Sequence, residues 1–207
     1  MEISSKKVYN DAETTLNINP FHIIAFTDGS AHPNNKSISS RAGYATCFAS
    51  GPISNKLIYG NLDISRIYAS NIRAEMFAII RALEYVYEIH ITNKLKWNLF
   101  TIITDCEFVI NLLETFMPNW SDDKIAEKSN PDLTKRIWNI YNKVKKIGCV
   151  KFIHVRSHNK NGWKTFKNGT YEKFCYENNE YVDQICGFAR SNLKPAEEVI
   201  ADVVFDT

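Results

Sequence analysis

The chain has 207 residues and a mass of 23.8 kDa, a length typical of one domain that builds its core without disulfide or metal support. Hydrophobic residues make up 44% of the sequence and charged residues 23%, which excludes collagen, a coiled coil and a wholly disordered chain. No apolar run approaches roughly eighteen residues, and the first residues show neither a secretory nor a transit pattern. We therefore expect an intracellular protein, cytoplasmic or nuclear, with no membrane partner.

Charge and cysteine content narrow the function classes further. The formal net charge is only +2, but residues 133–151 hold six basic residues and no acid, so positive charge is concentrated locally. The five cysteines are an odd number with no close pair, which argues against a disulfide framework and a zinc knuckle. We interpret them as structural thiols of a reducing compartment.

In chain order, the sequence predicts three strands before the first helix. Residues 1–20 are polar and are interpreted as an N-terminal extension. β-Branched and aromatic residues fill 21–28, and a Gly-Ser turn follows. Two further strands are expected at 42–49 and 56–61, separated by Gly51-Pro52. Strands in series indicate an antiparallel start to the sheet.

The pattern then alternates between helices and strands. Apolar residues recur at helical spacing over 74–89, which predicts an amphipathic helix. The elements expected after it are a strand at 100–105, a helix at 107–116, an irregular segment at 121–131, a helix at 133–147, a strand at 149–155 and a helix at 179–191. This order predicts an α/β domain over residues 21–192 with one mixed sheet, an inserted loop at 159–177 and an acidic C-terminal tail at 193–207.

Four acidic residues occupy positions that suggest chemistry. Asp28 and Asp105 each end an apolar strand, and strand ends are where open α/β sheets bind ligands. Glu75 shares the inward face of its helix with apolar residues. Asp183 lies one turn into the last expected helix.

Each acid also has an ordinary explanation. An Asp that ends a strand is often a turn former, and a Glu that opens a helix stabilises the helix dipole. Spacing alone does not show that the four acids converge. If they do, two carboxylates about 4 Å apart repel by about 4 kcal/mol at an effective dielectric constant of ~20. Mg²⁺ or Mn²⁺, which prefer oxygen ligands, would offset that repulsion.

The residues around these acids resemble the type 1 ribonuclease H family. Five blocks match in family order: Thr27-Asp28-Gly29-Ser30 with Ala42-Gly43-Tyr44-Ala45; Ser70-Asn71-Ile72-Arg73-Ala74-Glu75; Thr104-Asp105-Cys106 with Phe108-Val109; His154-Val155-Arg156-Ser157-His158; and Asn179-Glu180-Tyr181-Val182-Asp183 with Ala189-Arg190. Together the blocks span residues 21–192. One short block would be a weak signal, but five in order are specific.

The resemblance implies a ribonuclease H-like fold, a five-stranded mixed sheet flanked by helices. It implies that Asp28, Glu75, Asp105 and Asp183 bind two Mg²⁺ ions, with Mn²⁺ as a substitute, and that Asp28 bridges both. It gives His158 an auxiliary catalytic role. The activity implied is hydrolysis of the RNA strand of an RNA–DNA hybrid, leaving 5′-phosphate and 3′-hydroxyl ends. The expected partner is the hybrid, and the chain is expected to be a monomer.

The resemblance also implies substrate contacts. Asn71 matches a position that contacts the minor groove, where 2′-hydroxyls distinguish RNA from DNA. Ser70, Arg73 and Asn119 match positions near a pocket for a phosphate of the DNA strand. Competing explanations are that Ser70 caps a helix and that Arg73 forms a buried salt bridge.

The sequence departs from the family pattern in two places. After Trp120 the segment carries three acids and two lysines, so a full basic handle for the hybrid is not predicted. The stretch after His158 is long, and its basic and aromatic residues include Trp163 and Lys164. We interpret these two as substrate contacts that partly replace the handle. The alternative is a local hydrophobic patch with solvated lysines.

Two other function classes stay open at this point. The first keeps the fold and changes the substrate, as in a DNA nuclease or junction resolvase. The second is a non-catalytic nucleic-acid-binding module, against which the presence of all four acids argues. Cleavage tests on hybrid, duplex DNA and four-way junctions discriminate among the three.

Overall fold

A computed structural model of the chain describes residues 20–32, 41–62, 69–156 and 170–203. His158, Trp163 and Lys164 fall outside these ranges, as do the extension through residue 19 and residues 204–207. Within the described ranges, no helix is long and apolar enough to cross a membrane.

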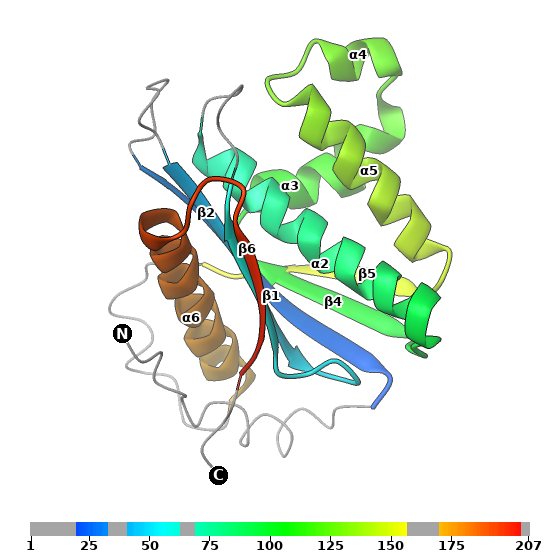
Figure 1. Cartoon of the computed structure of the whole chain (residues 1–207). Coiled ribbons are helices and arrows are strands. Elements are labelled where there is room, and N and C mark those ends of the chain that lie inside the picture. The colour runs from blue at the N-terminus through cyan, green and yellow to red at the C-terminus, as the bar shows by residue number, and fades with distance from the viewer. Residues whose placement is uncertain (1–19, 33–40, 63–68, 157–169, 204–207) are drawn as a thin grey trace.

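One mixed sheet forms the middle layer of the molecule (Figure 1). Its strands run in the spatial order β5-β4-β1-β2-β3-β6, and β1, β4 and β5 are parallel while β2, β3 and β6 pair in antiparallel fashion. The strands are β1 (His22–His32), β2 (Arg41–Ser50), β3 (Lys56–Asn61), β4 (Leu99–Thr104), β5 (Cys149–His154) and β6 (Glu198–Asp202).

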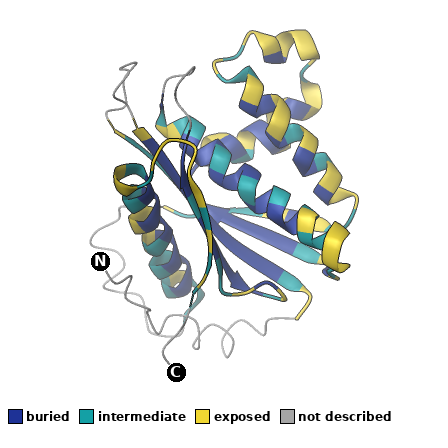
Figure 2. Cartoon of the chain, viewed as in Figure 1, coloured by how far each residue is buried: buried dark blue, intermediate teal, exposed yellow. Residues whose placement is uncertain are grey.

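Helices cover both faces of the sheet. The helical elements are α2 (Asn71–Asn93), α3 (Glu107–Asn111), the π-helical turn η1 (Leu112–Phe116), the 3₁₀ turn η2 (Met117–Asn119), α4 (Asp122–Ala126), α5 (Pro131–Lys145) and α6 (Tyr171–Asn192). Figure 1 shows α2, α3 and α5 on one side of the sheet and α6 on the other. Each face encloses its own apolar core, so the strands between them are buried on both sides (Figure 2).

Local sequence explains where the two long helices begin. The side chain of Ser70 accepts a hydrogen bond from the backbone N–H of Arg73 and caps α2. Thr170 does the same for α6, accepting from the N–H of Lys173. The helix α2 ends at Lys94, whose backbone is left-handed with φ of 55°.

The predicted fold class is confirmed, but four details of the prediction were wrong. Strand β1 runs to His32 instead of ending at Asp28, because residues 29–32 continue the pairing with β2. The sheet has six strands rather than five, because β6 lies in the expected acidic tail and pairs with β3. The helix α6 starts at Tyr171, inside the expected loop at 159–177, because Thr170 caps it and Phe174 is buried on its apolar face. The segment 121–131, expected to be irregular, contains α4, which Ser121 caps.

Candidate active site

The parallel pairing of β1 and β4 brings the first two acids together. Thr27 lies opposite Thr104, so the residues that follow, Asp28 and Asp105, emerge side by side. Neighbouring strands in a sheet lie about 4.8 Å apart, which sets the spacing of these two residues. Because β4 stops at Thr104 while β1 continues along β2, Asp105 begins a loop and Asp28 remains inside the sheet.

Gly29 allows the third acid to approach. A β-carbon at this position would lie 2.2 Å from the backbone nitrogen of Glu75 and 2.3 Å from the carbonyl carbon of Ala74. Only a glycine therefore lets the first turn of α2 rest directly on β1. Glu75, the fifth residue of α2, is thereby placed beside Asp28.

Gly43 allows a similar close approach of a helix on the opposite face of the sheet. A β-carbon there would lie 2.2 Å from the carbonyl oxygen of Cys186 and 2.5 Å from the nitrogen of Arg190. The middle of α6 can therefore lie against β2, next to β1. This contact brings Asp183 and Cys186 to the side of the sheet to which Asp28 points.

The four acids form two overlapping groups that share Asp28. Carboxylate oxygens of Asp28, Glu75 and Asp105 lie within 4.8 Å of one another. In the second group, ligand atoms of Asp28, Asp183 and Cys186 lie within the same distance. The sequence predicted the convergence of the acids but missed Cys186, although its position three residues after Asp183 places it on the same side of a helix.

Burial and mutual repulsion change the protonation of this cluster. Asp28 is 4% exposed, and burial followed by the nearby charge of Asp105 raises its pKa to about 7. Burial also raises the pKa of Glu75 well above its ordinary value, and the charge of Asp28 adds to the effect. Among the described residues no salt bridge involves any of the four acids.

The hydrogen bonds of the cluster leave acceptor capacity unused. Asp28 accepts from the N–H of Gly29 at 2.8 Å and from the thiol of Cys186 at 3.4 Å. The Oε2 atom of Glu75 is buried and has no hydrogen-bond partner. A buried carboxylate oxygen without a donor is costly unless a cation or water completes it. The donor set therefore fits hard divalent cations such as Mg²⁺ or Mn²⁺.

The residues that were expected to contact substrate and that the structure describes take part in local hydrogen bonds. Ser70 caps α2, and Asn71 Oδ1 accepts from the N–H of Ala31 at 2.7 Å, which ties the start of α2 to β1. Asn119 Nδ2 donates to the carbonyl of Thr115 at 2.9 Å. These bonds explain the local structure, and the substrate contacts stay predictions.

Arg73 is held away from the acids by a salt bridge. Its guanidinium donates two hydrogen bonds to the carboxylate of Asp132, at 2.9 and 2.7 Å, and a third to Asn130. The hydrogen bonds from Arg73 lower the pKa of Asp132. Arg73 is thus the partly buried, paired arginine that the sequence offered as an alternative.

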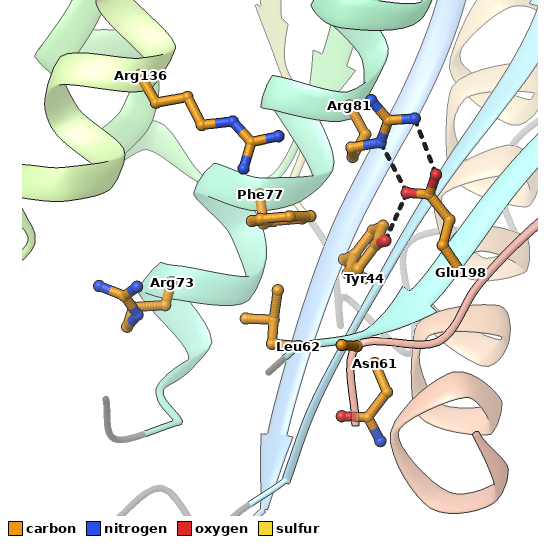
Figure 3. Close-up of a pocket in the computed structure, with 9 residues that line it drawn as sticks. Tyr44, Asn61, Leu62, Arg73, Phe77, Arg81, Arg136 and Glu198 are labelled. Atoms are coloured by element: carbon orange, nitrogen blue, oxygen red, sulfur yellow. Dashed lines mark hydrogen bonds and ion pairs between the residues drawn. The ribbon is translucent and has the colours of Figure 1, made fainter. Parts of the chain in front are cut away.

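Arg73 also lines a pocket of about 390 Å³ beside α2 (Figure 3). Figure 3 shows Arg81 facing Glu198, with the hydroxyl of Tyr44 on the same carboxylate. Arg136 lies over the ring of Phe77 at 4.8 Å. Because each of the three arginines of this pocket is already paired with a carboxylate, the pocket is not an open anion site.

The strand order and the convergent acids define the class of the protein: a ribonuclease H-like fold with a carboxylate site where β4 ends beside β1. The family model described as RNase H matches residues 21–188. The chain belongs to the ribonuclease H family. Ribonuclease H of Saccharomyces cerevisiae is 32% identical over 148 residues, which are 70% of this chain and 37% of the yeast protein. The chain thus spans little more than a third of that relative's length.

Solved structures support the fold at low sequence identity. LC9-RNase H1, described as a type 1 RNase H with the type 2 active-site motif, is 13% identical with a TM-score of 0.60. That match covers 89% of this chain and 79% of the other. The protease-reverse transcriptase of prototype foamy virus matches with 17% identity and a TM-score of 0.60, over 86% of this chain and 22% of that protein. LC11-RNase H1, solved in complex with an RNA/DNA hybrid, matches with 19% identity and a TM-score of 0.50, over 82% of this chain and 99% of the other.

Proposed function

We propose that the chain is an endoribonuclease that hydrolyses the RNA strand of RNA–DNA hybrids. Three observations support this activity: the family membership, the 32% identity to a yeast ribonuclease H, and the hybrid bound by a protein of the same fold. The observation that carries the chemistry is the pair of ligand groups that share Asp28, which is buried and has no salt bridge among the described residues. Divalent cations bound at such a site would contact the charged oxygens of a phosphodiester. A substrate of this kind therefore suits the site better than a neutral one.

The residues present fit two divalent cations, Mg²⁺ or Mn²⁺. One would be held by Asp28, Glu75 and Asp105, and the other by Asp28 and Asp183. When bound, such a pair supplies Lewis acidity to the phosphate and lowers the pKa of the attacking water. The products we propose carry 5′-phosphate and 3′-hydroxyl ends.

The protein's own part is to fix these carboxylates before substrate arrives. Gly29 and Gly43 hold α2 and α6 in contact with the sheet, so the acids on three elements keep their spacing. We propose that His158 acts as an auxiliary acid or base and that Asn71 reads the minor groove. Ser70, Arg73 and Asn119 are proposed to lie along the path of the DNA strand.

The test is cleavage of three labelled substrates in Mg²⁺: an RNA–DNA hybrid, duplex DNA and a four-way DNA junction. We expect cleavage of the RNA strand of the hybrid alone, with products that a 5′-phosphate-dependent exonuclease degrades. Asp105→Asn should lose this activity, and Asp202→Asn, at an exposed acid of β6, should retain it. Cleavage of the junction but not of the hybrid would instead identify a resolvase.

A second experiment addresses the proposed contacts of Trp163 and Lys164. Replacing Lys164 together with Lys160 and Lys167 by Ala should raise KM and flatten its dependence on salt, because fewer phosphate contacts release fewer counterions. Turnover should change little. An unaltered salt slope would place the phosphate contacts elsewhere, with the basic outer face of α5 as the next candidate.

A further inference from the structure

Cys186 lies inside the carboxylate cluster. It is fully buried on α6, and its Sγ is 3.4 Å from Oδ2 of Asp28 and 3.1 Å from the backbone carbonyl oxygen of Asp183. With the carboxylate oxygen of Asp183 it completes a group of three ligand atoms that lie within 4.8 Å of one another. Asp183 is exposed, so solvent and ions reach the group from that side.

The geometry of this group suits a cation that binds sulfur as well as oxygen. Zinc binds thiolates at about 2.3 Å and carboxylates at about 2.0 Å, which at a tetrahedral angle places sulfur and oxygen ~3.5 Å apart. The observed separation of Cys186 Sγ and Asp28 Oδ2 is 3.4 Å. Magnesium prefers oxygen ligands, whereas thiolates select softer cations.

A second feature points to a cation at the same place. Oε2 of Glu75 is buried without a hydrogen-bond partner, and Glu75 is only 8% exposed. Its carboxylate groups with that of Asp28, the residue common to both halves of the cluster. A cation bound at Asp28 and Cys186 would therefore share Asp28 with a carboxyl group whose buried oxygen has no hydrogen-bond donor, and a cation reduces the cost of burying such an oxygen.

We propose that Asp28, Asp183 and Cys186 form a site for a thiophilic divalent cation, of which Zn²⁺ is the representative, and that this cation displaces the Mg²⁺ ion expected at Asp28 and Asp183. On binding, the metal–sulfur bond replaces the S–H bond, and the proton leaves to solvent without any redox change. The displacement rests on the proposed function; the binding of the cation does not. Zn²⁺ is then an inhibitor of hybrid cleavage that competes with Mg²⁺.

Cobalt provides a direct probe, because Co²⁺ replaces Zn²⁺ and a thiolate ligand gives it an intense charge-transfer band in the near ultraviolet. The wild-type protein titrated with Co²⁺ should show this band at one ion per chain, and Zn²⁺ should remove it. Cys186→Ala and Cys186→Ser should both lack the band. The matched control is Cys175→Ala, which removes a buried thiol of the same helix and should retain it. No band in the wild type, or an equal band in Cys186→Ser, overturns the proposal.

An inhibition assay separates this proposal from the proposed function. At fixed Mg²⁺, the Zn²⁺ concentration that halves hybrid cleavage should rise by more than about tenfold in Cys186→Ala, each variant being compared with its own rate without Zn²⁺. Mg²⁺-dependent cleavage without the cobalt band would overturn the thiol site alone. The cobalt band without any hybrid cleavage would overturn the proposed function and leave the thiol site standing. If Cys186→Ala does not fold, the wild-type spectrum and Cys186→Ser decide.

Discussion

Two groups of carboxylates differ in how their charge is compensated: Glu84 and Glu198, which are partly buried, and the acid cluster around the buried Asp28 and Glu75. Beside Figure 3's pocket, Glu198 accepts hydrogen bonds from Arg81 and Tyr44, and Glu84 accepts from Arg136 and Arg81. In the acid cluster, where β4 ends beside β1, no arginine or lysine of the described residues forms a salt bridge with the acids.

The pKa of Glu84 and the pKa values of Asp28 and Glu75 are shifted in opposite directions. Burial alone would raise the pKa of Glu84, but the hydrogen bonds from Arg136 and Arg81 outweigh it and lower the pKa. For Asp28 and Glu75, burial and like charges act together and raise the pKa. Paired carboxylates stabilise the native structure, whereas unpaired ones cost stability until a ligand binds. The contrast distinguishes a group that stabilises the fold from the group that we propose binds cations.

The largest expected effect is on catalysis. Asp28→Asn should lower hybrid cleavage by roughly a hundredfold or more, because it removes the ligand shared by both cation sites. The unfolding temperature should stay equal or rise, since a buried repulsion is relieved. Steady-state kinetics and thermal unfolding on the same preparation measure both. Near-normal turnover in Mg²⁺ would show that the acid cluster is not the catalytic site.

The second effect is stabilisation by metal. Mg²⁺ at about 100 times its dissociation constant should stabilise the wild type by ~2.7 kcal/mol, because the unfolded chain lacks the site. For a chain of this size the unfolding temperature would rise by roughly 5–10 °C. Differential scanning calorimetry with and without Mg²⁺ checks this, with Asp28→Asn as the variant that should not respond. An equal rise in that variant would contradict binding at the cluster.

The third effect concerns the paired group. Arg81→Met should destabilise the protein by about 2 kcal/mol, because Glu84 and Glu198 would lose hydrogen bonds while their side chains are only 19% and 26% exposed. The unfolding temperature would fall by roughly 4–8 °C, and hybrid cleavage at 25 °C should persist. Lys56→Met is the matched control: its partner Asp202 is 69% exposed, so we expect a smaller change in unfolding temperature than for Arg81→Met. An equal loss of stability in the two variants would contradict the distinction between the partly buried ion pairs of Arg81 and the exposed pair of Lys56.

A further expected effect is the pH dependence of stability without metal. In the unfolded chain the pKa of Asp28 is its ordinary value of 3.8, and in the folded protein it is about 7. Between these values the folded state binds more protons, so this contribution to stability is complete below pH 3.8 and is lost as pH rises to about 7. The slope cannot exceed ~1.4 kcal/mol per pH unit for one proton.

Urea unfolding between pH 5 and 7 in a chelator measures that slope, which should be smaller in Asp28→Asn than in the wild type. Glu75 contributes in the same direction, so some slope should remain in the variant. Adding Mg²⁺ should suppress it, because a bound cation favours the ionised carboxylates. A slope that is identical in variant and wild type would place the titrating group outside the cluster.

The amino-acid sequence by itself determined the family, the order of the elements and the four acids. These features are local: apolar periodicity defines a strand or helix, and short motifs carry the acids within them. Asp28, for example, lies in strand β1, whose apolar and β-branched residues before it already predict a strand. Family resemblance then supplied the expected grouping, which ordinary spacing did not show.

Only the tertiary structure decided what depends on distant partners. Strand β6 is short and half exposed, and its pairing with β3 and the anchoring of Glu198 by Arg81 are not visible in its own residues. The salt bridge of Arg73 likewise depends on Asp132, which lies 59 positions away in the sequence. From the sequence, Cys186 was interpreted as a structural thiol. Only the packing of α6 at Gly43 places its sulfur beside Asp28. Hydrogen bonds and metal ligands require angstrom-level placement in space, whereas local propensity fixes only the elements that carry them.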